Sequence, residues 1–170
     1  MKNNIILIGM PGVGKSTIGV VLAKKLGFSF MDSDLLIQER EGKVLQQIIE
    51  VEGLDGFNRI EEEVNMSIHV KNTVIATGGS AVYGRNAMEH LSHIGLVIYL
   101  QLPYETLSER LGDLNERGVA MQSGQTLLEL YQERKPLYES YADVTIDCTG
   151  KQIREIVDEL TGYWKSEGGL

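Results

Sequence analysis

Residues 5–17 read IILIGMPGVGKST, an apolar run followed by a glycine-rich turn that ends in a lysine and two hydroxyl residues. The last nine residues, 9–17, fit the pattern G-x-x-x-x-G-K-[ST]. Glycines let the backbone curl so that N–H groups point inward at anionic oxygens, and a helix that starts near Lys15 adds its positive N-terminal dipole. The stretch therefore predicts a strand, a loop that binds nucleotide phosphates, and a helix.

The residues of this loop have distinct expected tasks. Lys15 would reach the β- and γ-phosphates, and Ser16 would ligate Mg²⁺. Arg110, on the predicted helix 104–111, is expected to stack on the adenine ring of ATP. The residues expected to bind the nucleotide are Gly12, Val13, Gly14, Lys15, Ser16, Thr17 and Arg110.

The composition of the chain limits the classes of partner. It has 170 residues, 42% of them apolar, and a formal net charge of −8. One folded domain is the simplest expectation, and the acidic balance disfavours nucleic acid and anionic membranes as partners. No apolar run approaches the ~20 residues of a membrane span. The absence of an export signal and the single Cys148, which cannot form an internal disulfide, favour a cytoplasmic protein.

Short apolar runs alternate along the chain with longer patterns of helical spacing. Five such runs predict a parallel sheet covered by helices on both faces, a three-layer α/β sandwich. Ligands of such folds bind at the carboxyl ends of the strands, where the glycine-rich loop would lie. The expected strands are 5–8, 28–31, 73–76, 96–100 and 144–146. The expected helices are 16–26, 35–40, 44–51, 56–70, 87–91, 104–111, 127–138 and 153–163.

The strand ends indicate what happens to the bound phosphate. A guanine-specific switch usually carries Asn-Lys-x-Asp, and that string is absent. A motor or transporter ATPase usually has an apolar strand that ends in Asp or Asp-Glu, whereas strands 73–76 and 96–100 are followed by Thr77 and Gln101. The second predicted strand does end at acidic residues, Asp32 and Asp34 of the string DSD at 32–34. These features favour transfer of the phosphoryl group to a bound acceptor.

The two carboxylates of this string suit a transfer reaction. Asp34 would accept or orient the acceptor's hydroxyl proton, and Asp32 would hold Mg²⁺ directly or through water. If the segment is extended, both side chains share one face. The alternative is that Ser33 or Asp34 caps the helix that begins at Leu35, and capping and catalysis can coexist.

A transferase must also keep water away from the phosphoryl group. Residues 115–125 contain two glycines and little periodicity, which is typical of a mobile lid. Arg117 near its start would reach the transferring group and stabilise its charge.

Together these residues resemble the shikimate kinase family, a branch of the nucleoside-monophosphate-kinase-like fold. The similarity covers almost the whole chain. It rests on the strings GMPGVGKST, DSD, FNRIE (57–61), TGGSAV (77–82) and ERKPLY (133–138), with Arg110 and Arg117. The resemblance implies a P-loop NTPase fold with a five-stranded parallel sheet, as a single kinase domain over 1–170 with a lid at about 114–125. It also implies transfer of the γ-phosphate of ATP, with Mg²⁺, to the 3-hydroxyl of shikimate.

Residue roles follow from the same resemblance. Gly78 and Gly79 would let the backbone approach the acceptor closely, and Arg134 would bind its carboxylate. Asp34 would bind the acceptor hydroxyls and act as the base. The implied catalytic residues are Lys15, Asp34 and Arg117. The implied metal residues are Ser16 and Asp32. The residues expected at the acceptor are Asp34, Asn58, Arg59, Gly78, Gly79, Ser80 and Arg134.

Two positions depart from the family pattern. Where the family usually has Phe-Arg-x-x-Glu this chain has Asn58, and the usual arginine is one of two that grip the acceptor carboxylate. A charge-assisted hydrogen bond contributes roughly 1.5–3 kcal/mol, so its loss predicts roughly 10- to 150-fold weaker binding of a shikimate-like acid. Asn58 can still donate a neutral hydrogen bond. Arg59 replaces the usual arginine only if its side chain turns toward the acceptor. The second departure is Ser80, in place of a third glycine. The lid also reads NERGV, without the proline that commonly follows its arginine.

The changes leave alternatives open on the acceptor side. The acceptor is shikimate bound less tightly or another hydroxylated metabolite, as in a gluconate-kinase-like or nucleotide kinase. A nucleotide-binding regulator without catalysis is the third possibility. The strings DSD and ERKPLY favour the shikimate branch, and a regulator would not need both Asp34 and Arg117. A monomer is expected, since the family is mostly monomeric.

Overall fold

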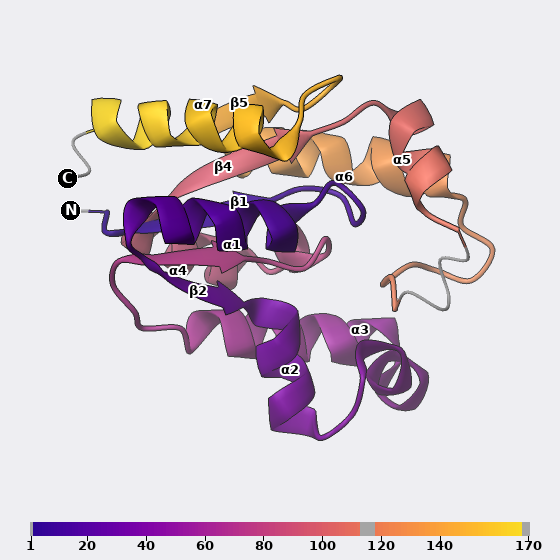
Figure 1. Cartoon of the computed structure of the whole chain (residues 1–170). Coiled ribbons are helices and arrows are strands. Elements are labelled where there is room, and N and C mark those ends of the chain that lie inside the picture. The colour runs from indigo at the N-terminus through magenta and orange to yellow at the C-terminus, as the bar shows by residue number, and fades with distance from the viewer. Residues whose placement is uncertain (1, 113–117, 168–170) are drawn as a thin grey trace.

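The computed structural model describes residues 2–112 and 118–167. They form a parallel sheet in the strand order β2-β3-β1-β4-β5 (Figure 1). The strands are β1 (Asn4–Ile8), β2 (Ser29–Asp32), β3 (Thr73–Ala76), β4 (Gly95–Gln101) and β5 (Val144–Asp147). The expected five-stranded sheet is therefore confirmed.

Helices cover both faces of this sheet. Figure 1 shows α1 and α7 on one face and α4 and α6 on the other. The helices are α1 (Lys15–Leu26), α2 (Ser33–Glu41), α3 (Leu45–Met66), α4 (Arg85–Ile94), α5 (Tyr104–Arg110), α6 (Leu127–Tyr141) and α7 (Ile153–Ser166), with a 3₁₀ turn η1 (Ala81–Tyr83). Within the described residues, none of these helices has the length and apolar character to cross a membrane.

Strand β1 lies at the centre of the sheet, and its side chains from Ile5 to Ile8 are fully buried. A strand covered on both faces needs a continuous apolar run, which explains the sequence IILI. The chain leaves β1 through α1 on one face of the sheet and leaves the adjacent β3 through α4 on the other face, so the carboxyl end of β1 is a topological switch point. The glycine-rich loop leaves β1 at this point.

Helix α3 (Leu45–Met66) consists of two helical segments that meet at Gly53, where the backbone is non-helical with φ 71° and ψ 176°. The expected break between helices 44–51 and 56–70 is therefore confirmed. The expected end at residue 70 is wrong, because Ser67 terminates the helix. Ile68 continues the apolar periodicity and is buried against the sheet core, but it does so from a non-helical segment.

Candidate active site

The loop at residues 9–17 owes its shape to three glycines. Gly9, Gly12 and Gly14 have φ values of 148°, 86° and 102°, which side-chain-bearing residues rarely adopt. A Cβ on Gly9 would also lie 2.6 Å from the carbonyl oxygen of Leu100. The loop therefore curls at the end of β1 and delivers the first turn of α1, which begins at Lys15, to its centre.

Lys15 lies inside this loop with only 8% of its surface exposed. Its Nζ donates hydrogen bonds to the carbonyl oxygens of Gly9 at 2.7 Å and Met10 at 2.9 Å. Burial lowers the pKa of Lys15 to about 8, and the charge of Asp34 opposes that shift. The ammonium lines a cavity of about 400 Å³ that also contains Gly12, Gly14, Ser16, Thr17, Asp34 and Leu111.

Asp32 joins the end of β2 to the loop. Its Oδ2 accepts a hydrogen bond from Ser16 Oγ at 2.7 Å, and its Oδ1 accepts one from the backbone N–H of Asp34 at 2.9 Å. Asp32 is thus the N-cap of α2, and the expectation that Ser33 or Asp34 caps this helix is wrong. The reason is that β2 extends to Asp32 and α2 begins at once with Ser33.

The Ser16–Asp32 pair fits a magnesium site completed by a nucleotide. Mg²⁺ prefers oxygen ligands and is usually held by one or two protein groups together with phosphates and waters. A hydroxyl and a carboxylate stand here at the mouth of the loop. In the described ranges no group of three or more His, Cys, Asp or Glu side chains is placed to hold a metal ion by itself. The donor set therefore matches a cation that arrives with phosphate.

Asp34 lies in the first turn of α2, between two cavities. Burial raises the pKa of its carboxyl to about 6, the charge of Asp32 adds to the rise, and Lys15 opposes it. A carboxylate with this pKa is ionised at neutral pH and still basic enough to accept a proton.

Gly78 and Gly79 follow β3 and form a wall shared by these two cavities. A Cβ on Gly78 would lie 2.5 Å from Asp34 Oδ1, and a Cβ on Gly79 would lie 2.7 Å from Pro11 Cδ. Either side chain would collide with its neighbours, so the sequence keeps bare backbone at this wall, as the expectation of close approach requires.

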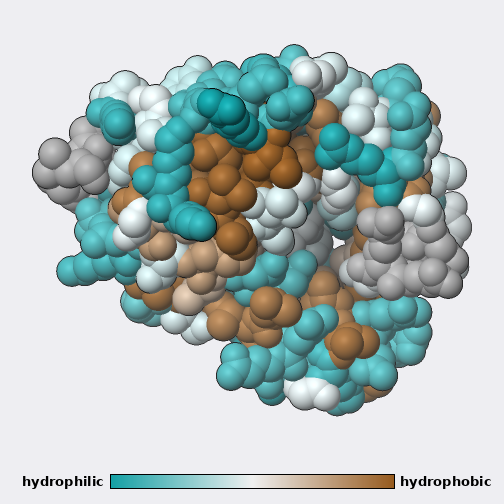
Figure 2. Space-filling model, viewed as in Figure 1, coloured by the Kyte–Doolittle hydropathy of each residue, from teal (hydrophilic) through white to brown (hydrophobic). Residues whose placement is uncertain are grey.

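The second cavity is narrow, about 60 Å³, and opens beside Asp34. Figure 2 shows the molecule hollowed between the sheet and the lobe formed by α2 and α3. Residues 118–120 close one side of this cavity. Its lining residues are Pro11, Asp34, Leu45, Phe57, Gly78, Gly79, Ser80, Gly118, Val119, Ala120 and Arg134. A six-membered ring with substituents needs more room, so this wall must move outward before such a molecule enters.

Arg134 of α6 brings a positive charge to this cavity although only 1% of its surface is exposed. Its guanidinium donates hydrogen bonds to the carbonyl oxygen of Ala120 and to Tyr83 Oη at 3.3 Å, and lies over the Tyr83 ring at 5.4 Å. These contacts fix the guanidinium from two sides. The fork is therefore oriented before any anion arrives.

Asn58 and Arg59 were expected at the acceptor, but neither lines this cavity. Asn58 is half-buried, and within 2–112 and 118–167 its buried Oδ1 has no hydrogen-bond partner. Arg59 is exposed, because adjacent residues of a helix point about 100° apart. The structure therefore does not bring Arg59 to the acceptor cavity, and it is no substitute for an arginine at position 58 in this conformation.

Ser80 does line the cavity, and it is paired with a residue that sequence reasoning did not assign to the site. Its Oγ donates a hydrogen bond to Glu61 Oε1 at 2.6 Å. Glu61 is 2% exposed, and its Oε2 has no hydrogen-bond partner among the residues that the structure describes. Burial raises the pKa of Glu61 to about 7. The signal in the sequence was the last residue of FNRIE, which matches a family position.

Tyr138 is a second residue that sequence reasoning left without a role. It is fully buried, and its hydroxyl donates to the carbonyl oxygen of Gly79 at 2.5 Å. Its ring stacks on Tyr99 of β4 at 5.1 Å between centroids. Tyr138 follows Arg134 by one helical turn in the string ERKPLY, so the spacing itself places both on one face of α6.

Arg110 lies on the other side of the loop. Its Nη1 donates to the carbonyl oxygen of Gly12 at 3.2 Å, and its side chain lines a third cavity of about 240 Å³ with Val13, Thr17, Ile18, Cys148, Lys151, Ile153 and Ile156. Apolar walls beside an exposed guanidinium suit a flat aromatic ring.

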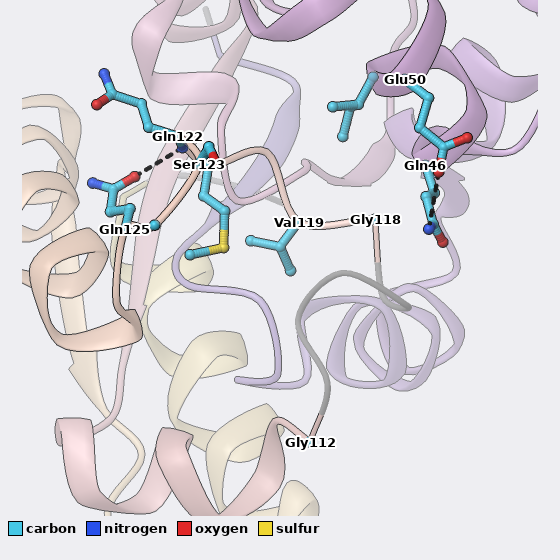
Figure 3. A pocket seen from close by; sticks show the side chains of 11 residues that line it. Gln46, Glu50, Gly112, Gly118, Val119, Gln122, Ser123 and Gln125 are labelled. Atoms are coloured by element: carbon cyan, nitrogen blue, oxygen red, sulfur yellow. Dashed lines mark hydrogen bonds between the residues drawn. The ribbon is translucent and has the colours of Figure 1, made fainter.

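The expected lid falls partly outside the described residues, and so does Arg117. Residues 118–125 face the start of α3 across a cavity of about 850 Å³ (Figure 3). Figure 3 shows Gln46 and Glu50 on the α3 side, with Val119 and Gln122 opposite. This open space gives the segment room to shift toward or away from the acceptor cavity.

Comparisons with known proteins agree with this geometry. The family model described as Shikimate kinase matches residues 11–164. The Thiobacillus denitrificans shikimate kinase is 41% identical over 165 residues, covering 95% of this chain and 90% of the relative. The Persephonella marina shikimate kinase is 37% identical, covering 94% of this chain and 97% of its own length.

Solved structures give the same result. The Acinetobacter baumannii shikimate kinase in complex with shikimate superposes with a TM-score of 0.87 at 34% identity, covering 99% of this chain and 96% of its own. Thymidylate kinase from Candida albicans, at 14% identity and a TM-score of 0.62, shares the fold alone. The expected family and fold class are confirmed: this chain belongs to the shikimate kinase family.

Proposed function

We propose that the protein is an ATP-dependent shikimate kinase that transfers the γ-phosphate of ATP to a hydroxyl of shikimate. The observation that carries this proposal is the position of Asp34, which lines both the cavity of the phosphate loop and the narrow cavity beside it. A carboxylate between a phosphate site and an acceptor site is where a general base for phosphoryl transfer must stand. The relative with shikimate bound supports the choice of acceptor.

Three residues of the chain, Asp34, Lys15 and Arg117, would act in the reaction. Asp34 accepts the proton of the attacking hydroxyl, which its pKa of about 6 permits. Lys15 holds the β- and γ-phosphates and stabilises the charge that moves to the leaving oxygen. Burial, and to a smaller extent the charge of Arg134, lowers the pKa of Lys15, and bound phosphate would restore the lysine's usual basicity because a nearby anion favours the ammonium. Arg117 would stabilise the transferring group from the lid.

The nucleotide fits the residues around the loop. The phosphates would accept hydrogen bonds from the backbone of residues 12–17, and the adenine would occupy the cavity beside Arg110. Mg²⁺ would be held by Ser16 and, directly or through water, by Asp32, where it supplies charge neutralisation for the phosphates.

The acceptor would be gripped on one side by Arg134, whose oriented guanidinium suits a carboxylate. Gly78 and Gly79 would contact its hydroxyls through the backbone. Because Asn58 replaces the usual second arginine, we expect a higher KM for shikimate than the family pattern would give. Outward movement of residues 118–120 would admit the acceptor, and their return would exclude water, which is the role of a lid.

The same proposal includes a single kinase domain that works as a cytoplasmic monomer. The supporting observations are a hydrophobic core around the sheet, joined through Leu36 to a smaller cluster between α2 and α3, together with the single buried Cys148 and the net charge of −8. Sedimentation of the purified protein at enzymatic concentrations tests the monomer directly: a single species of about 19 kDa is expected.

Coupled detection of ADP release tests the proposed function. Purified protein with MgATP is given shikimate, gluconate, quinate or a nucleoside monophosphate in turn. We expect release that depends on shikimate, with a clearly smaller kcat/KM for each of the others. Release with another acceptor and none with shikimate would overturn the proposal, and release that is equal without any acceptor would show a hydrolase.

A further inference from the structure

Tyr83 of η1 and Glu133 of α6 join Arg134 in a chain of hydrogen bonds. Arg134 Nε donates to Tyr83 Oη at 3.3 Å, and Tyr83 Oη donates to Glu133 Oε1 at 2.6 Å. The other oxygen, Glu133 Oε2, accepts a hydrogen bond from Gln125 Nε2 at 2.9 Å. A guanidinium only donates and an ionised carboxylate only accepts, so the hydroxyl between them has its donor and acceptor roles fixed. Tyr83 is therefore held from one side by Glu133 and holds Arg134 on the other.

The ring of Tyr83 contacts the same guanidinium at its face. Arg134 Cζ lies 5.4 Å from the ring centroid, within the range of a cation–π contact. Arg134 is 1% exposed, and within 2–112 and 118–167 it forms no salt bridge. A buried cation without a carboxylate partner is unfavourable until an anion joins it. Tyr83 thus orients a charge that lacks its counter-ion.

Two hydrogen-bond partners of Arg134, Ala120 and Tyr83, belong to different parts of the molecule. Nη2 donates to the carbonyl oxygen of Ala120, in the segment 118–120 that must move outward before an acceptor enters. Tyr83 belongs to η1, which packs against α3, α4 and α6. Outward movement of the segment would therefore break the Ala120 contact and leave the Tyr83 contact in place.

The atoms of these two contacts determine which edge of the guanidinium remains for an anion. A guanidinium can bind a carboxylate through two parallel hydrogen bonds, either from Nε and a neighbouring Nη or from Nη1 and Nη2. Tyr83 occupies Nε, which blocks the first edge. Nη2 becomes available when Ala120 withdraws. The edge formed by Nη1 and Nη2 is thus the one left for a carboxylate.

We propose that Tyr83 is a positioning residue for the carboxylate of the acceptor. Tyr83 is not among the residues that line the narrow cavity, so it acts through Arg134, whose Nη1–Nη2 edge it keeps ready for the carboxylate when residues 118–120 move outward. Because Asn58 replaces the second arginine of the family pattern, the grip depends on this one guanidinium. The inference rests on the proposed function, since it assigns a further residue to the same acceptor site.

A double-mutant cycle tests whether Tyr83 acts through Arg134. Tyr83→Phe keeps the ring and removes the hydroxyl, so KM for shikimate should rise about 3- to 10-fold while kcat and KM for ATP change less than about twofold. Arg134→Met removes the guanidinium, so Tyr83→Phe in that background should leave kcat/KM for shikimate unchanged. Tyr163→Phe removes an exposed hydroxyl from α7 and should retain wild-type kinetics. An unchanged KM in Tyr83→Phe, or an equal loss in both backgrounds, would overturn the inference.

Nuclear magnetic resonance of the guanidinium gives a second readout that needs no turnover. The Nε–H signal of Arg134, identified by its absence from Arg134→Met, should be protected from exchange with water in the wild type and should lose that protection in Tyr83→Phe. Added shikimate should leave the protection intact, because its carboxylate takes the Nη1–Nη2 edge. Full protection in Tyr83→Phe would overturn the inference. If the wild type fails to phosphorylate shikimate, the proposed function is wrong, and exchange in the free enzyme still decides whether Tyr83 holds Arg134.

Discussion

The phosphate side of the site, residues 9–17 with Asp32, differs from the acceptor side, where Ser80 and Arg134 line the narrow cavity and Asn58 and Glu61 lie behind it on α3. On the phosphate side the buried polar groups have partners: Lys15 Nζ has two carbonyl oxygens and Asp32 has two donors. On the acceptor side Asn58 Oδ1 and Glu61 Oε2 have no hydrogen-bond partner in the described part of the chain. Unpaired buried groups are costly unless a ligand completes them. The comparison indicates that the phosphate side is built in advance, whereas the acceptor side combines one oriented group, Arg134, with buried oxygens that lack donors.

The largest expected effect comes from the phosphate side. Lys15→Met removes the buried ammonium that lies within the loop, so kcat/KM should fall by about 100- to 1,000-fold because charge stabilisation in the transition state is lost. Steady-state kinetics with circular dichroism as a check of folding measure this loss. The control is Lys24→Met at an exposed position of the same helix, which should retain wild-type kinetics. Near-normal turnover by Lys15→Met would show that the loop is not the phosphate site.

On the acceptor side, Arg134→Lys should weaken the binding of shikimate and leave the binding of ATP unchanged. Lysine cannot form the two-pronged contact of a guanidinium with a carboxylate, so KM for shikimate should rise roughly 10- to 150-fold. KM for ATP should be unchanged, because Arg134 lines only the narrow cavity. Arg85→Lys, on the surface of α4, serves as the matched control. An equal rise in both KM values would contradict the division into two sides.

Asn58→Arg tests the acceptor side by adding a positive group instead of removing one. A guanidinium at this position would face Glu61, one turn along α3, and would supply the second positive group for the acceptor carboxylate. We expect KM for shikimate to fall about 10-fold, measured by coupled ADP release. Met66→Arg adds the same charge at an exposed position of α3 and should have no such effect. An unchanged KM in Asn58→Arg would mean that the carboxylate binds elsewhere.

Asp34, which lies between the two sides of the site, should control the acid limb of the pH–activity profile. Burial raises the pKa of this base to about 6, and it must be ionised to accept a proton. Activity is therefore full above that pKa and is lost as pH falls through it, so kcat/KM should drop about 10-fold between pH 7 and pH 5. A pH–rate profile measures this limb. A limb centred at the ordinary aspartate value near 4 would place the base in open solvent and contradict the buried geometry.

The sequence predicted the phosphate side in more detail than the acceptor side for a physical reason. The loop is one contiguous stretch whose glycines and lysine determine the local backbone, so IILIGMPGVGKST was sufficient to place it after β1. The acceptor cavity is assembled from α2, α3, the turn after β3 and α6, which no local pattern relates. The Glu61–Ser80 hydrogen bond joins residues nineteen positions apart in the chain and could not be predicted without the fold.

Helix ends were missed for a similar reason. The capping role went to Asp32 rather than Ser33 or Asp34 because strand pairing with β3 extends β2 to Asp32. The helix expected to reach residue 70 stopped at Met66 because Ile68 turns into the core of the sheet. In both places tertiary packing overrode a local pattern.

Following the γ-phosphoryl group tests the central claim most directly. Wild-type protein and Asp34→Asn are each incubated with shikimate and ATP labelled at the γ-phosphorus, and ATP binding is measured on the same samples. We expect the label to move to shikimate in the wild type and to remain on ATP in Asp34→Asn, while both proteins bind ATP alike. Transfer of the label by Asp34→Asn at the wild-type rate, or loss of ATP binding in that variant, would contradict a base that stands between two separate sites.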